Sequence, residues 1–160
     1  MNPSPYRRGS FSFVVFGLTQ VVIDIEPAYY MARWLWPIHR FFHTYLGATL
    51  VAIVVILFGK PICESILRLW NSSLSEPQRA WLGVKPKIST MAAVIGAFFG
   101  SYSHVFLDSI MHSDMHPLAP FSNDNSLLYI ISIERLYAAC FLAGIFGGMV
   151  LLILLAKRWK

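Results

Sequence analysis

The chain has 160 residues, of which 56% are hydrophobic and 13% charged, and it carries a formal net charge of +5. A water-soluble domain needs more charge than this to cover its surface, so the composition excludes an ordinary soluble protein. The length is enough for one domain but not for several, and residues 1–160 are treated as one unit. The long apolar runs predict an all-α integral membrane protein.

Four apolar stretches, at about residues 10–25, 38–59, 89–112 and 133–156, are predicted to cross the membrane as helices. The first of them resembles a secretory signal, but it lacks a small-residue cleavage site, so we interpret it as a retained helix. The expected fold is therefore a polytopic bundle of four transmembrane helices.

Two connecting segments are expected to lie on opposite surfaces of the membrane. Residues 27–37, PAYYMARWLWP, are dense in Tyr and Trp, which favour the membrane–water interface. Residues 61–86 begin as an amphipathic stretch and then become loop-like, so we expect them along the cytoplasmic surface.

The charged residues are divided unequally between the two sides of this predicted topology. The side with both termini holds ten basic residues: Arg7, Arg8, Lys60, Arg68, Arg79, Lys85, Lys87, Lys157, Arg158 and Lys160. The other side holds all five histidines and six of the eight acidic residues. The positive-inside rule therefore places both termini in the cytoplasm and the histidines outside. Because the basic residues are scattered topology signals, they do not indicate nucleic-acid binding.

The end of the third predicted span has polar residues at every fourth position. His104, Asp108, His112 and His116 follow one another at this spacing, which places side chains on one face of a helix. Pro117 pushes His116 out of helical geometry, so His112 and His116 are either ligands or solvated loop histidines. The same face continues backward through small residues, which let a neighbouring helix approach closely. These are Ala92, Gly96 and Gly100.

The first two predicted spans bring further candidates to the same depth. His39 and His43 are four residues apart and are expected on one face of the second helix. Asp24 and Glu26 lie at the end of the first helix, where both side chains can turn inward. Counted from the cytoplasmic end of each helix, the candidates rise roughly 21–24 Å into a hydrocarbon core of about 30 Å.

Imidazoles and carboxylates that converge at one depth are suited to a divalent cation. Imidazole nitrogen and carboxylate oxygen are ordinary zinc ligands where cysteine is absent, and a bound cation removes the cost of burying acids. Six candidates would be enough for one or two ions: Asp24, Glu26, His39, His43, His104 and Asp108. Two alternatives stay open, a simple hydrogen-bonded pair of His104 with Asp108 and interfacial histidines at positions 39 and 43.

Two arginines on the outer side are candidates for binding an anionic substrate. Arg40 follows His39 directly, and Arg135 lies at the start of the fourth span. Contact with lipid headgroups is the alternative for both, and pairing with Glu134 is a further alternative for Arg135.

Three motifs resemble a known family. The segments "DIE", "HRFFHTYLGA" and "SHVFLDSIMH" with a later "PLAPFS" are similar to the bacterial family of membrane-bound, predicted metal-dependent hydrolases, which includes LexA-regulated inner-membrane proteins. The likeness runs from the first helix to about Ser122. The chain departs from the family pattern at Ile23, where the family has proline, and at Glu26, where it has aspartate. His43 also comes one residue earlier than the family's second histidine.

The resemblance implies a location and an activity. It implies the bacterial inner membrane, and the positive-inside rule then places the site on the side of the periplasm or exterior. The family is thought to be related to zinc-dependent phospholipase C and zinc nucleases, which implies hydrolysis of a phosphoester.

The sequence thus predicts a metal-dependent hydrolase that acts on a lipid or lipid-linked substrate from the surrounding membrane. Asp24 and Glu26 are the candidates for proton transfer, in addition to their candidacy as ligands. The alternative is a non-catalytic membrane protein that binds or senses a divalent metal. The oligomeric state is not predicted.

Overall fold

The computed structural model describes residues 10–158, so Arg7, Arg8 and Lys160 lie outside the described residues. The regular structure in this range is helical, without strands, which confirms the all-α class. The elements in chain order are α1 (Phe13–Ile23), α2 (Ile25–Ala32), α3 (Tyr45–Val54), the π-helical turn η1 (Val55–Gly59), α4 (Lys60–Ser73), α5 (Glu76–Leu82), α6 (Thr90–Met111) and α7 (Ile133–Arg158).

Three helices of the described chain are long and apolar enough to cross a membrane. They are Tyr45–Ser73, Thr90–Met111 and Ile133–Lys157, and the last two agree with the spans predicted at 89–112 and 133–156. Helix α1 has 11 residues. At 1.5 Å per residue it would cross about half of a hydrocarbon core of about 30 Å. The helices thus indicate a membrane protein, while a fourth span at 10–25 stays a prediction.

The predicted start of the second span is wrong. Residues 38–44 are not helical, and α3 begins only at Tyr45. Thr44 is the N-cap, and its hydroxyl oxygen accepts a hydrogen bond from the backbone N–H of Gly47 at 2.9 Å. A capping side chain satisfies an N–H group that has no partner within the helix. His39 and His43 consequently lie in the connection before α3 rather than on one helix face.

The predicted end of the same span is wrong as well. The helix does not stop at Gly59 but continues as α4 to Ser73, with η1 between the two α-helical parts. Pro61 follows η1 and has no backbone N–H to donate to the preceding turn. A wider π-helical turn accommodates such a local break without ending the helix.

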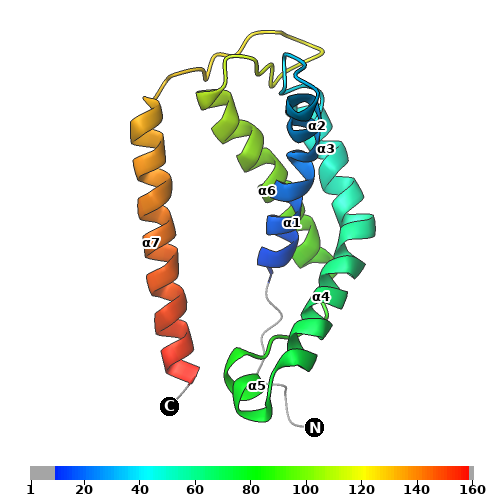
Figure 1. Ribbon diagram of the computed structural model, residues 1–160, viewed down its shortest axis with the longest axis vertical. Coiled ribbons are helices and arrows are strands. Elements are labelled where there is room, and N and C mark those ends of the chain that lie inside the picture. The colour runs from blue at the N-terminus through cyan, green and yellow to red at the C-terminus, as the bar shows by residue number, and fades with distance from the viewer. Residues whose placement is uncertain (1–9, 159–160) are drawn as a thin grey trace.

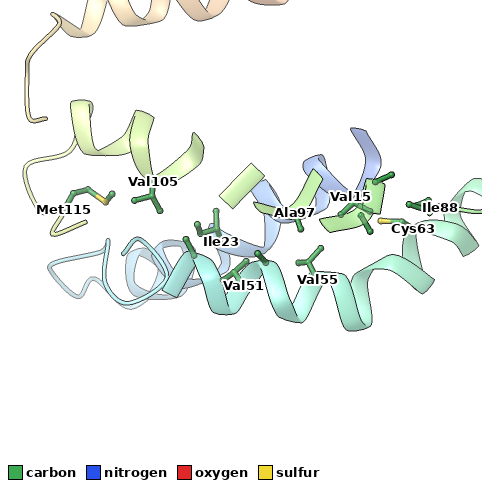
Figure 2. Close-up of a cluster of buried hydrophobic side chains, with 13 residues drawn as sticks. Val15, Ile23, Val51, Val55, Cys63, Ile88, Ala97, Val105 and Met115 are labelled. Carbon is green, nitrogen blue, oxygen red and sulfur yellow. The ribbon is translucent and has the colours of Figure 1, made fainter. Parts of the chain in front are cut away.

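The small-residue face of α6 is the surface on which α1 packs. A Cβ atom at Gly96 would lie 2.6 Å from the backbone oxygen of Ser12, and one at Gly100 would lie 3.1 Å from that of Phe16. This confirms that the small residues allow close helix approach. Figure 2 shows the buried side chains between α1, α3 and α6, including Val15 and Val51.

Different elements gather at the two ends of the molecule, and we call the end that holds the histidines and most of the acidic residues the polar end. Helix α2, the start of α3 and the loop after α6 gather at one end, and α5 lies at the other (Figure 1). Helix α7 stands beside the bundle, and none of its most apolar window is buried. The bundle of α1, α3 and α6 therefore positions the polar end, and α7 contributes little to it.

Candidate metal centre

Four predicted ligands come together at the polar end. They are Asp24, between α1 and α2, His43, just before α3, and His104 and Asp108 on the last turns of α6. One ligand atom from each lies within 4.8 Å of the ligand atoms of the other three. We call these residues the four-donor cluster.

The two imidazoles of the four-donor cluster face the same two carboxylates. His104 Nε2 lies 3.2 Å from Asp24 Oδ1 and 3.1 Å from Asp108 Oδ2. His43 Nε2 lies 3.7 Å from Asp24 Oδ1 and 3.5 Å from Asp108 Oδ2. The helical spacing of His104 and Asp108 places both on one face of α6, while the fold brings in the other two.

Three of the four ring nitrogens of this cluster lack hydrogen-bond partners among the described residues. His43 Nδ1, His43 Nε2 and His104 Nε2 are buried and form no hydrogen bond within residues 10–158. A buried polar atom left in this state costs about 1–3 kcal/mol. A cation between the imidazoles and the carboxylates would satisfy both kinds of donor atom, so the residues fit a divalent metal ion.

The electrostatics of His43 show how strongly the carboxylates act on this position. Burial by itself lowers its pKa, but the negative charges of the nearby Asp108, Glu26 and Asp24 carboxylates outweigh this effect and raise the pKa to about 8. Without a metal ion, the ring is therefore mostly protonated at neutral pH. Metal ions bind deprotonated imidazole, so a proton and a cation compete for this ring.

The four-donor cluster is open on one side. The side chain of Asp24 is 57% exposed, whereas that of His43 is fully buried. The side chains of His104 and Asp108 are mostly buried. Water or a ligand can therefore approach the cluster past Asp24.

Glu26 lies beside the four-donor cluster but holds the backbone. Its carboxylate accepts hydrogen bonds from the N–H groups of Phe41 at 3.1 Å and Phe42 at 2.7 Å. Its nearest approach to His43 is 3.9 Å, between Oε2 and Nδ1. Glu26 thus fixes the turn that presents His43, a role that the sequence did not suggest.

A second group contains His39, His112 and Asp114, again with ligand atoms within 4.8 Å of one another. Asp114 Oδ1 accepts a hydrogen bond from His39 Nδ1 at 2.9 Å, and Oδ2 accepts from the N–H groups of Ile38 and His39. The rings of His39 and His112 stack with centroids 4.2 Å apart. We call these three residues the His39 group.

Asp114 lies in the loop after α6, yet it is buried. Burial raises its pKa, but the hydrogen bonds from His39 and from the backbone outweigh this effect, and its pKa is lowered overall. Burial is the largest influence on His39 and lowers its pKa. No local pattern marked Asp114, because its partners lie 75 and 76 residues away in the chain.

The remaining predicted site residues lie outside both groups. His116 is exposed, and its Nδ1 donates to the backbone oxygen of Asn123 at 2.6 Å. Arg40 donates to the Pro37 carbonyl at 2.8 Å, and its guanidinium lies 3.7 Å from the centroid of the Tyr30 ring. Arg135 is exposed on the first turn of α7. Substrate binding by these arginines stays a prediction.

One residue that contacts the four-donor cluster, Gln20, was not predicted from the sequence. Gln20 of α1 lies between Gly100 and His104 of α6, and its amide contacts both. The available signal was its position four residues before Asp24, which places both on one face of the first helix.

Comparison of the chain with protein-family models, with curated proteins and with solved structures finds no match. The resemblance to membrane-bound hydrolases therefore stays a prediction.

Proposed function

We propose that the protein is a membrane-embedded, metal-dependent hydrolase that holds a divalent cation with Asp24, His43, His104 and Asp108. The observation that carries the proposal is that the buried Nε2 atoms of His43 and His104 both face the carboxylates of Asp24 and Asp108 without a hydrogen bond to any described residue. A hydrogen-bonded histidine–aspartate pair, the simplest alternative, would leave fewer of these atoms unsatisfied.

The donor set favours zinc or a similar transition metal. Two imidazole nitrogens and two carboxylate oxygens suit such ions better than the oxygen-only sites of magnesium or calcium. One ion suffices for the four-donor cluster. When bound, a divalent cation supplies Lewis acidity, which polarises a scissile group and activates water.

The four ligands and Glu26 would have different roles in the reaction. His43, His104 and Asp108 are largely buried and would hold the cation in place. Asp24 faces both the cluster and the outside, so its carboxylate can accept a proton and pass it to solvent. Glu26 would orient the turn that carries His43 through its two backbone hydrogen bonds.

A lipid phosphoester is the substrate class that we propose. An apolar groove of about 790 Å³ lies on the flank of α3 and α6 and is lined mainly by aromatic and aliphatic side chains. Its lining includes Tyr45, two residues after His43, and Ser103, which precedes His104. Hydrocarbon is the natural content of such a groove on helices that cross a membrane. This arrangement supports entry of a lipid from the side.

We also propose that the cluster faces the exterior of a bacterial inner membrane, with both termini in the cytoplasm. The support is charge asymmetry: α4, α5 and the segment after them carry Arg68, Arg79, Lys85 and Lys87. Helix α5 lies at the end opposite α2 (Figure 1). Basic residues are enriched on the cytoplasmic side.

The experiment combines elemental analysis of purified protein with a phospholipid hydrolysis assay that detects the released phosphate-containing product. We expect stoichiometric metal and metal-dependent turnover in the wild type, and loss of both in His43→Ala. His116→Ala is the matched control, because His116 is exposed and lies outside both groups. Metal retained in His43→Ala would overturn the ligand assignment. Metal without turnover on any phosphoester lipid would favour a non-catalytic metal sensor.

A further inference from the structure

The side chain of Gln20 connects α1 to the metal-binding face of α6. Its Nε2 donates a hydrogen bond to the backbone oxygen of Gly100 at 2.9 Å, and its Oε1 lies 2.7 Å from His104 Nδ1. Both contacts depend on the close approach of the helices, because a Cβ atom at Gly100 would lie 3.1 Å from the Phe16 backbone oxygen. Gln20 is therefore held between two fixed points of α6.

The hydrogen bonds determine the orientation of the amide. The carbonyl oxygen of Gly100 can only accept, so the amide nitrogen of Gln20 must face it. The amide oxygen then faces His104, and since it too can only accept, His104 Nδ1 must carry the proton. The position of the proton on His104 thus follows from the backbone carbonyl of Gly100, four residues earlier on the same helix.

The other ring nitrogen of His104 is the one that faces the carboxylates. Nε2 lies 3.1 Å from Asp108 and 3.2 Å from Asp24 and forms no hydrogen bond with any residue that the structure describes. With the proton held on Nδ1, the neutral ring directs the lone pair of Nε2 into the four-donor cluster. Metal-binding histidines commonly donate their second N–H to an oxygen in this way.

We infer that Gln20 is a positioning residue for metal binding: it selects the Nδ1-protonated tautomer of His104 and aims Nε2 at the cation. This inference rests on the proposed metal site and adds a residue that does not itself contact the metal. Asp114 has a similar role toward His39. Gln20 differs in that its acceptor is neutral and in that it acts from α1 on a histidine of α6.

Three variants separate positioning from packing. Gln20→Leu replaces the amide with an apolar side chain of similar size and so removes both hydrogen bonds. Gln20→Glu restores an acceptor for His104 Nδ1 while losing the donor to Gly100. Thr19→Val is the matched control, because Thr19 is buried in the same α1–α6 contact and its hydroxyl donates only to Val15 within α1.

The first measurement is zinc affinity by chelator competition in detergent micelles, with thermal unfolding to verify the fold. We expect Gln20→Leu to bind zinc roughly 10- to 100-fold more weakly, as is typical when the partner of a metal-binding histidine is lost. Gln20→Glu should recover most of the affinity, and Thr19→Val should match the wild type. Equal affinity of Gln20→Leu and wild type would overturn the inference, as would an equal loss in Thr19→Val.

The second measurement is the imidazole ¹⁵N spectrum of histidine-labelled protein without metal, with the His104 signals assigned by their loss in His104→Gln. We expect a protonated Nδ1 on His104 in the wild type, and loss of this preference in Gln20→Leu. An Nδ1 without a proton in the wild type would refute the inference. This readout needs no bound metal, so it separates failure of the inference from failure of the proposed metal site.

Discussion

The two clusters of ionisable residues are neighbours, yet their hydrogen bonding differs. The rings of His39 and His43 have centroids only 4.8 Å apart. In the His39 group, the Asp114 carboxylate already accepts three N–H groups. In the four-donor cluster, the ring nitrogens of His43 form no hydrogen bond in the described part of the chain. Proximity of histidine and aspartate is therefore not enough to indicate a metal site; unsatisfied donor atoms are the better criterion.

The difference between the two clusters predicts that Asp108 is needed for metal binding, whereas Asp114 is needed for stability. Asp108→Asn should abolish stoichiometric metal binding, with an affinity loss of at least about 100-fold, because a neutral amide replaces a carboxylate that faces both imidazoles. Elemental analysis after dialysis measures the effect. Asp124→Asn, an exposed position in the loop after α6, is the control and should keep its metal. Metal retained in Asp108→Asn would remove the distinction between the clusters.

The pH dependence of metal affinity should follow His43. Its pKa of about 8 in the absence of metal means that binding displaces a proton below this pH. Affinity should therefore fall by about tenfold for each pH unit below 8 and level off above it. Chelator competition between pH 6 and 9 tests this. A flat profile would show that His43 does not ligate the metal.

The His39 group should respond in stability rather than in metal content. Asp114→Ala leaves buried N–H groups of Ile38 and His39 without a partner, so it should destabilise the fold by about 3 kcal/mol. Thermal unfolding in micelles should show this loss, while elemental analysis finds the wild-type metal content. If Asp114→Ala lost its metal but kept its stability, the His39 group would itself be part of the metal site.

The smallest expected effect concerns the helix contact beneath the four-donor cluster. Gly100→Ala adds a methyl group 3.1 Å from the Phe16 backbone oxygen and should destabilise the protein by about 1 kcal/mol. The metal affinity should fall with it, because α1 carries Asp24. Gly144→Ala on α7 is the matched control, since no atom of the other described residues lies within 4 Å of the added atom. Equal unfolding temperatures for the two variants would contradict the packing argument.

The sequence pattern predicted the parts of the site that depend on one helix. The i, i+4 spacing of His104 and Asp108 was sufficient, because α6 extends through both positions as expected. The same reasoning failed for His39 and His43, because Thr44 caps α3 and leaves both residues in an irregular connection. His43 still reaches the cluster, held there by the contacts of Glu26 with the preceding turn.

The amino-acid sequence by itself determined the membrane class, the helical fold and most of the candidate ligands, because hydropathy and helical periodicity are local properties of the chain. Only the tertiary structure decided which candidates meet. The partners of His104, Glu26 and Asp114 lie on other segments, and hydrogen bonds over such separations form only after the helices have packed. Those bonds distinguish the histidine whose nitrogens stay unsatisfied from the histidine that Asp114 already holds.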